Sequence, residues 1–199
     1  KSAYAAKDLG RATKGAAQGL LAKVYMYEKK WAECLAACDD VINSNQYSLD
    51  PDFASIFRQA KEHGVESLFE FEGQNGHEGW GIGGYFSVQG PRGGMAAGYD
   101  GWGFNSPSDA LMAAFEPGDV RKAATAYTPG EVLWDGDTVK VPQPNPRYNY
   151  KAYVSKLKEQ NYDSWSSGKN LRILRYGEIL LIKAEAANEL GSTADAKTE

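Results

Sequence analysis

Two helical patterns joined by a very short link constrain the fold of this chain more than any other feature. Between Thr13 and Ser44, apolar residues recur every three or four positions in two runs, and only Glu28, Lys29 and Lys30 separate the runs. Amphipathic helices with so short a connection must lie antiparallel, so the sequence predicts a helical hairpin. The residues expected to face the core are Ala16, Ala17, Leu20, Leu21, Val24 and Tyr25 in the first helix and Trp31, Cys34, Leu35, Cys38, Val41 and Ile42 in the second.

The distribution of small and large side chains in this hairpin is typical of a tetratricopeptide (TPR) repeat. Ala16 and Gly19 in the first helix, with small residues in the second, allow the helices to approach closely, while Tyr25 and Trp31 lie near the link. Thr13 is a suitable N-cap for the first helix. We therefore expect residues 13–44 to form one TPR-like unit.

A further helix is predicted near the end of the chain, over residues 171–190. Its expected apolar stripe is Ile173, Gly177, Leu180, Ala184 and Ala187, and its polar face is Glu178, Glu185 and Glu189. Gly191 fits the position that follows a helix C-cap. No second amphipathic pattern follows before Glu199, and a repeat needs both helices to bury its stripe. We therefore expect this helix to belong to a later TPR unit of a longer protein.

The middle of the chain, residues 64–155, has a different character. Ser67–Glu72 reads as a strand, and Val132–Trp134 with Thr138–Val141 reads as a hairpin around Asp135 and Gly136. Residues 108–115 are a short helix candidate, and Pro142–Pro146 reads as an extended linker. The expected fold class is mainly α, with TPR-like helical hairpins, an irregular loop-rich region and short β-hairpins.

Glycine and aromatic residues concentrate within this middle region. Residues 73–105 hold 12 of the 22 glycines, together with Trp80, Tyr85, Phe86, Tyr99, Trp102 and Phe104. A structureless stretch of this length is either functional or disordered. Because disordered segments are poor in aromatic residues, we expect an ordered loop with a function.

Sugars suit such a loop, since glycine lets backbone pass close to a ligand and aromatic rings offer flat apolar faces. A pyranose presents C–H groups on one side and hydroxyls around its edge, so it needs both rings and hydrogen-bonding groups. The alternative is that the rings only pack the loop onto the helices. The expected stacking residues are Trp80, Tyr85, Tyr99 and Trp102, and the expected hydrogen-bonding residues are Asn75, Arg92, Asp100 and Asn105.

Other chemistry has weaker support in the sequence. Gly79–Gly84 matches G-x-G-x-x-G, but no helix is expected after it to hold a pyrophosphate, so no dinucleotide cofactor is expected. Cys34 and Cys38 have no further ligands nearby, and His63 and His77 are isolated, so no metal site is expected. A glycosidase remains an alternative, because its carboxyl pair could come from Glu70, Glu72, Glu78, Asp100 and Asp109.

Charge and hydropathy exclude two classes of partner. The 22 basic and 26 acidic residues give a net charge of −4, which argues against binding to nucleic acid. The longest apolar run is Ile179–Ile182, far shorter than the roughly 20 residues that span a bilayer. We expect no membrane-spanning segment in these residues.

Several segments together resemble the SusD/RagB-like family of outer-membrane nutrient-binding lipoproteins. The order and spacing match over nearly the whole chain, although Glu116–Arg121 departs mildly from the family's frequent Asp-Pro-Arg turn. Members of this family usually run to more than twice this length. The matching segments are Gly10–Tyr25, Trp31–Ser44, Tyr47–Leu49, Phe53–Phe57, Glu66–Phe71 and Asn170–Ala186.

This resemblance implies a fold of several TPR units and a function without catalysis. It implies capture of an oligosaccharide, or of a peptide in some branches, and delivery to a SusC-like TonB-dependent transporter in the outer membrane. It also implies a cell-surface lipoprotein, held to the membrane only by a lipid anchor outside this chain. The alternative from a different class is a TPR module that binds a protein and has no affinity for sugar.

Overall fold

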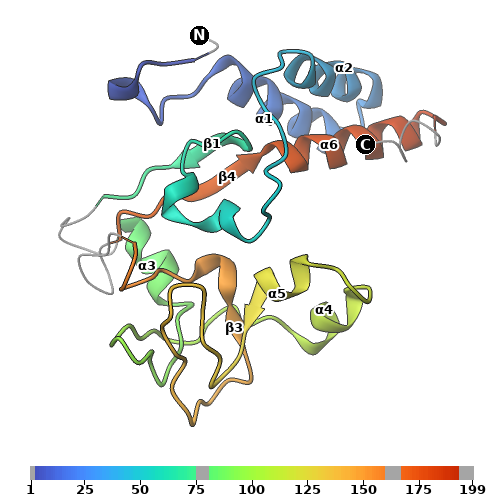
Figure 1. Ribbon diagram of the computed structural model, residues 1–199. Helices are drawn as coiled ribbons and strands as arrows, with labels where there is room; N and C mark the ends of the chain where they lie inside the picture. The colour runs from blue at the N-terminus through green and yellow to red at the C-terminus, as the bar shows by residue number, and fades with distance from the viewer. Residues whose placement is uncertain (1–2, 75–80, 160–166, 193–199) are drawn as a thin grey trace. The chain divides into compact units, whose positions relative to one another are not determined.

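The computed structural model describes residues 3–74, 81–159 and 167–192, and the chain divides into two compact units (Figure 1). Unit 1 comprises Lys1–Pro51, His63–Phe71 and Arg172–Glu199, and unit 2 comprises Asp52–Glu62 and Glu72–Leu171. Both units are therefore assembled from segments that are distant in the sequence.

Unit 1 contains the predicted helical hairpin. Its elements are η1 (Ala6–Asp8), α1 (Lys14–Tyr27), α2 (Trp31–Ile42), β1 (Ser67–Phe71), most of β4 (Leu171–Arg175) and α6 (Tyr176–Glu189). Gln18 early in α1 donates to Asp40 late in α2 over 2.7 Å, as an antiparallel pair requires. The Oγ1 atom of Thr13 accepts from the Ala16 N–H, which confirms the predicted N-cap. The late helix α6 packs against both α1 and α2.

The buried face of α1 differs from the predicted stripe. Leu20, Leu21 and Val24 are 40–50% exposed, whereas the small residues Gly15, Ala16, Gly19 and Ala22 are buried. A Cβ atom on Gly19 would lie within 2.7–3.0 Å of side-chain carbons of Leu68, Leu174 and Ile179. Large residues from the other elements of unit 1 fill the space above the small ones. The predicted small residues Ala16 and Gly19 are therefore buried, whereas the large aliphatic residues of the predicted stripe are not.

Residues 171–175 form a strand, not the first turn of a helix. β4 pairs with β1, and the buried Leu174 alternates with the exposed Ile173, as in a strand with one covered face. The carboxylate of Glu70 lies 3.3 Å from Nε of Arg172, and Glu66 forms an ion pair with Arg175. Residues 171–175 are thus engaged with β1 and the segment before it, and the helix starts only at Tyr176.

The buried stripe of α6 is correspondingly shifted. It consists of Ile179, Ile182, Ala186 and Ala187 in place of the predicted residues, apart from Ala187. The end of the helix agrees with the sequence, because Gly191 has φ of 85° and the Ser192 N–H donates to the Ala187 carbonyl.

Both cysteines pack inside unit 1 as free thiols. Cys34 and Cys38 lie on the buried face of α2, and Cys34 Sγ donates to the Ala22 carbonyl oxygen over 3.4 Å. Burial raises the pKa of the Cys38 thiol to about 12. Both residues therefore act as small apolar side chains in the core.

Unit 2 has little regular structure. Its elements are η2 (Ser55–Phe57), η3 (Gln59–Lys61), α3 (Gly81–Ser87), α4 (Asp109–Ala114), α5 (Arg121–Thr125), β2 (Ala126–Tyr127), β3 (Tyr148–Asn149) and η4 (Tyr150–Ala152). β2 and β3 pair antiparallel. The short helix α4 was predicted, and Ser108 caps it. The predicted hairpin is confirmed as a bridge between Val132 and Thr138.

The core of unit 2 is built mainly from tyrosines. Tyr127 lies at its centre, with ring centroids 5.3–5.7 Å from those of Tyr148, Tyr150 and Tyr153. The cluster of buried residues is Met95, Tyr99, Tyr127, Leu133, Val139, Tyr148, Tyr150 and Tyr153. Aromatic packing of this kind lets irregular backbone form a dense core without long helices or strands.

The described elements are mainly helical with two two-stranded sheets, which confirms the expected fold class. Among the helices in the described part of the chain, none combines the length and the hydropathy that a membrane span would need.

Candidate functional site

The glycine- and aromatic-rich stretch of unit 2 is ordered where it is described. After α3 the chain doubles back, and backbone N–H groups of Gly101, Gly103 and Phe104 donate to the carbonyls of Pro91, Gly90 and Val88 over 2.8–3.0 Å. A Cβ atom on Gly101 would overlap the Ser87 carbonyl oxygen, so only glycine permits this close approach. We refer to residues 88–105 as the aromatic loop.

The helix α3 was not expected from the sequence. It starts at Gly81, inside the G-x-G-x-x-G match, where a loop without a following helix was predicted. Phe86 is buried against Ala152 and Val154, and Ile82 packs on the same cluster. Burial of these two side chains stabilises a glycine-rich helix of only seven residues, and this tertiary contact overrides the low helix propensity of glycine.

Three aromatic side chains at this site are open to solvent. Tyr85 in α3 is 42% exposed, and Trp102 and Phe104 in the aromatic loop are 40% and 50% exposed. The rings of Trp102 and Phe104 meet edge to face with centroids 5.7 Å apart. Because the backbone beneath them is hydrogen-bonded, the rings are held in place while still accessible.

Phe104 was absent from the predicted stacking residues, although it is the most exposed of the three rings. Its position two residues after Trp102, with only Gly103 between them, was the available signal. The predicted Trp80 lies outside the described residues, as do Asn75, Glu78 and His77.

Tyr99 was predicted to stack on a ligand, but the structure places it in the core of unit 2. Its side chain is only 2% exposed, and its hydroxyl donates to the Phe86 carbonyl oxygen over 3.2 Å. Burial raises the pKa of this phenol. Tyr99 packs edge to face against Tyr153, with centroids 6.1 Å apart, so it belongs to the core and cannot offer a face to a ligand.

The predicted polar residues have different surroundings. Arg92 Nε donates to the Trp102 carbonyl oxygen over 2.7 Å, which fixes the backbone under the exposed indole. Asn105 has φ of 51° and donates from Nδ2 to Oε1 of Gln89 over 2.7 Å. Asp100 is exposed. Arg92 and Asn105 therefore position the aromatic loop.

The side chain of buried Gln89 fixes the conformation of the aromatic loop through hydrogen bonds. Its Oε1 atom accepts from Nδ2 of both Asn105 and Asn149 at 2.7 Å, and its Nε2 donates to the Tyr85 carbonyl. With these bonds, Gln89 ties together the end of α3, the end of the aromatic loop and β3.

Residues 142–146 also hold the aromatic loop in place through hydrogen bonds, whereas the sequence predicted only an extended linker here. Gln143 Oε1 accepts from the Gly93 N–H and from the Tyr148 hydroxyl, both at 2.8 Å, while its Nε2 donates to the Gly94 carbonyl. Asn145 Nδ2 donates to the Gly103 carbonyl over 3.0 Å. This segment is bonded to the loop along its length, since its side chains satisfy backbone groups that have no strand partner.

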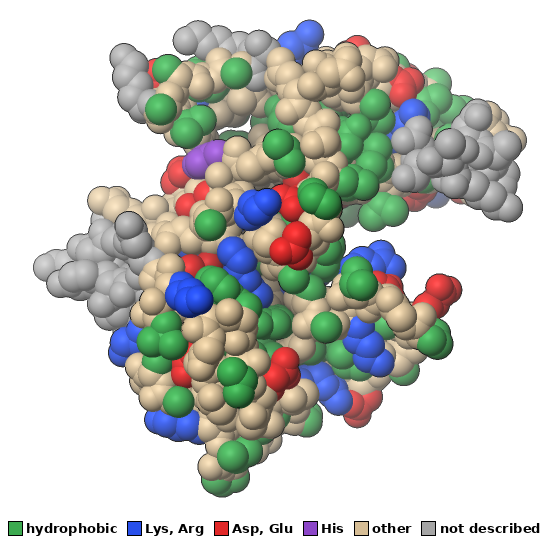
Figure 2. Space-filling view, viewed as in Figure 1, with side chains coloured by type: hydrophobic (Ala, Val, Ile, Leu, Met, Phe, Trp, Pro, Cys, Tyr) green, Lys and Arg blue, Asp and Glu red, His purple; other side chains and the backbone are tan. Residues whose placement is uncertain are grey.

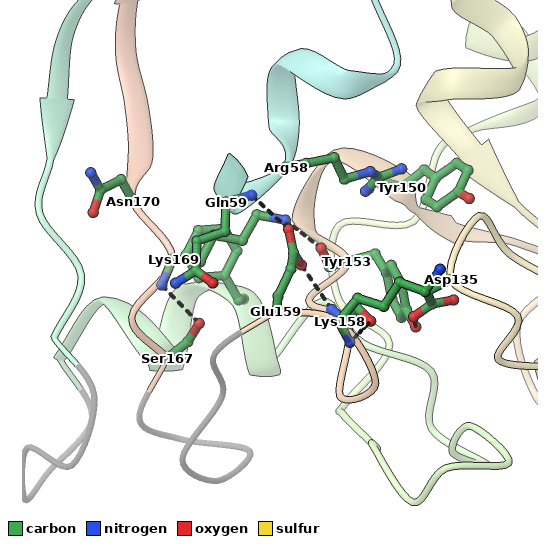
Figure 3. A network of polar contacts seen from close by, with 12 residues as sticks. Arg58, Gln59, Asp135, Tyr150, Tyr153, Lys158, Glu159, Ser167, Lys169 and Asn170 are labelled. Atoms are coloured by element: carbon green, nitrogen blue, oxygen red, sulfur yellow. Dashed lines mark hydrogen bonds and ion pairs between the residues drawn. The ribbon is translucent and has the colours of Figure 1, made fainter. Parts of the chain in front are cut away.

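A buried ionic network lies elsewhere in unit 2 (Figure 3). The carboxylate of Glu159 accepts from the backbone N–H groups of Gln59 and Ser155 over 2.7 and 2.8 Å and lies 3.6 Å from Nζ of Lys169. Lys169 also donates to the Tyr153 carbonyl, and its side chain is 1% exposed. These groups are paired and closed off from solvent, so they stabilise the fold.

A cation stacked between aromatic rings completes the network. The Arg58 guanidinium lies 4.5 Å from the ring centroid of Tyr150 and 5.2 Å from that of Trp134. Burial lowers the pKa of Arg58, while the nearby Tyr150 and Glu159 act in the opposite direction. Arg58 thus holds residues 52–62 onto the rest of unit 2.

Two acids considered for catalysis are engaged in ion pairs. Asp109 lies 2.6 Å from a guanidinium nitrogen of Arg147, and Glu70 lies beside Arg172 inside unit 1. Asp100, another of these acids, is exposed in the aromatic loop.

Comparison with known proteins identifies similar chains. Residues 40–199 match the family model described as SusD family. SusD-like protein P2 of Formosa agariphila is 28% identical over an alignment that covers 90% of this chain and 38% of that protein.

Solved structures share the fold. Surface glycan-binding protein A from Bacteroides thetaiotaomicron, in complex with laminarihexaose, has a TM-score of 0.81 at 24% identity, over 99% of this chain and 48% of that one. A laminarin binding SusD-like protein has a TM-score of 0.77 at 21% identity, over 98% of this chain and 48% of that one. The chain thus spans about half the length of these relatives, or less.

Proposed function

The chain belongs to the SusD family, and from this premise we propose that it contributes the glycan-capturing surface of a non-catalytic, cell-surface nutrient uptake protein. The observation that carries the proposal is the pair of exposed rings, Trp102 and Phe104, on a backbone held by Arg92 and Asn145. A surface fixed before the ligand arrives loses little conformational entropy on binding.

The proposed ligand is an oligosaccharide, and a glucan of the laminarin type is the first to test. Support comes from the fold shared with a protein solved with laminarihexaose. Tyr85 and Trp102 would stack on sugar rings, Phe104 would widen this surface, and Asp100 is an exposed acceptor for hydroxyls. Within the predicted ligand-binding region, residues 64–155, the part of unit 2 from Gly81 to Asn105 would carry this surface, and no cofactor is needed for capture.

Isothermal titration calorimetry tests this proposal. We expect laminarihexaose, or another hexasaccharide in a panel with cellohexaose and maltohexaose, to bind the wild-type chain. The double variant Trp102→Ala with Phe104→Ala should bind at least about tenfold more weakly, a loss of about 1.4 kcal/mol. Tyr27→Ala removes an even more exposed ring, from α1, and should bind as the wild type does.

Two results would contradict the proposal. One is a double variant that binds the sugar as well as the wild type, and the other is a chain that binds peptides but no member of the glycan panel. An assay for new reducing ends tests the non-catalytic part, and we expect none after incubation with the polysaccharide.

We also propose a protein partner, a SusC-like TonB-dependent transporter, with the lipid anchor supplied outside these residues. The observation favouring a protein contact is the outer face of α1, where Leu20, Leu21, Val24 and Tyr27 are exposed side by side. In the longer protein, Leu21→Glu with Val24→Glu should weaken copurification with the transporter while leaving sugar affinity unchanged. Unchanged copurification would remove α1 from the proposed contact.

A further inference from the structure

Unit 1 contains a cavity of about 470 Å³ that the aromatic loop does not contribute to. Its walls come from the segment before α1, the turn after α2, the segment that leads into β1, and β1 itself. Figure 2 shows the surface hollowed beside His63, the histidine drawn in purple. The volume falls within the range of about 300–1,000 Å³ that is usual for small-molecule sites.

One wall of this cavity is rigid. The Tyr47 hydroxyl is 3.1 Å from Oγ1 of Thr13, the N-cap residue of α1, and its ring lies where a Cβ atom of Gly15 would be. The ring of Tyr176 stacks on that of Tyr47 at 6.5 Å and 22°. Tyr47 is thus fixed by the helix start and by α6, so this wall exists before any ligand binds.

The side chains around the cavity combine aromatic rings with polar groups. Tyr4 and Tyr47 supply rings, while Gln46 and His63 supply polar atoms. A ligand that fits must therefore have an apolar face and several hydrogen-bonding groups, as a pyranose does.

The charged groups of the lining already have counter-charges. Nε of Arg11 lies 3.2 Å from Asp8, and the buried carboxylate of Glu70 lies 3.3 Å from Nε of Arg172 and accepts from the His63 N–H. An ionic ligand that displaced the buried pair of Glu70 and Arg172 would leave a buried charge without its partner. The lining therefore favours a neutral ligand.

We propose that this cavity is a second carbohydrate site, which binds one or two neutral pyranose units. It does not depend on the aromatic loop, and it would give the chain two separate contacts with glycan. Two sites on one chain raise the avidity for a long polysaccharide above that for a short oligosaccharide.

Nuclear magnetic resonance of the 15N-labelled 199-residue chain tests the proposal directly. We expect methyl β-glucoside and laminaribiose to shift the amide signals of Gly10, Gln46, Gly64 and Val65, which border the cavity. The amides of Gly101 and Gly103 report the aromatic loop separately. Shifts of the loop amides with none at the cavity would overturn this proposal and leave the proposed function standing. Shifts of the cavity amides alone would support this proposal and contradict the proposed role of the aromatic loop.

Two substitutions at exposed valines make the test specific. Val65→Trp should fill the cavity and weaken the cavity response at least tenfold, whereas Val132→Trp, at an exposed valine of unit 2, should not. If Val65→Trp does not fold, Tyr4→Ala serves in its place by removing a ring. An unchanged response in a folded Val65→Trp or in Tyr4→Ala would place the sugar elsewhere.

The ligand class is tested with charged sugars in the same experiment. Glucuronic acid and glucosamine match the neutral sugar in size but carry a negative or positive charge. We expect both to bind the cavity more weakly than methyl β-glucoside. Tighter binding of either would overturn the assignment of a neutral ligand.

Discussion

The two units reach order by different physical means. In unit 1, regular helices pack through small residues such as Gly19, and the strands β1 and β4 are joined by ion pairs of Glu66 and Glu70 with arginines. In unit 2, few backbone groups find regular partners, so side chains such as Gln89 and Gln143 bond to the backbone, around a tyrosine core. An irregular surface such as the aromatic loop can therefore still be held in a fixed conformation by hydrogen bonds.

The largest expected effect concerns the buried ion pair of unit 2. Lys169→Met leaves the buried Glu159 carboxylate without its cation, so we expect the free energy of unfolding to fall by about 3–5 kcal/mol. Urea titration followed by near-UV circular dichroism measures this loss. Lys156→Met, at an exposed lysine, is the matched control and should change stability by less than about 0.5 kcal/mol.

A double variant sharpens this test. Adding Glu159→Gln to Lys169→Met removes the uncompensated charge, so part of the lost stability should return. If the single variant were as stable as the wild type, the network would not stabilise unit 2 as described.

The next effect concerns the small-residue packing of unit 1. Gly19→Val should destabilise the chain by about 1–3 kcal/mol, because the added carbons overlap Leu68, Leu174 and Ile179. Valine has the higher helix propensity, so a loss here must come from packing. Ala17→Val places the same side chain on the exposed face of α1 and should be nearly neutral in the same urea titration.

A smaller effect is expected at the brace of the aromatic loop. Gln143→Ala removes the bonds to Gly93, Gly94 and Tyr148, so we expect a loss of about 1 kcal/mol in stability and weaker glycan binding by calorimetry. Gln143→Glu keeps the acceptor atom for Gly93 and Tyr148 and should lose less. Equal glycan affinity in all three proteins would show that the brace does not position the site.

The last prediction concerns the buried thiols of α2, which should have little effect on stability at neutral pH. Burial raises the pKa of Cys38 to about 12, so the native thiol should react with Ellman's reagent at pH 8 at least about a hundredfold more slowly than in urea. An unfolded thiol loses its proton near pH 8.5. Above that pH, the folded state therefore keeps a proton on Cys38 that the unfolded state has lost. The contribution of the thiol to stability should therefore fall as the pH rises from about 9 toward 12.

Much of the candidate site followed from composition. The concentration of glycine and aromatic residues located the loop, and Tyr85 and Trp102 are exposed as a binding surface requires. Tyr99 has the same local composition around it but is buried, because its ring meets Tyr153, a residue more than 50 positions away. Which ring faces solvent depends on such distant contacts.

Local signals determined the hairpin of α1 and α2, the caps Thr13 and Ser108, and the helix end at Gly191, since periodicity and capping act within a few residues. Only tertiary structure decided that the large aliphatic residues of α1 face solvent, that residues 171–175 form a strand beside β1, and that Gln143 supports the loop. Each of these outcomes depends on partners tens of residues away, whose distances no local pattern encodes.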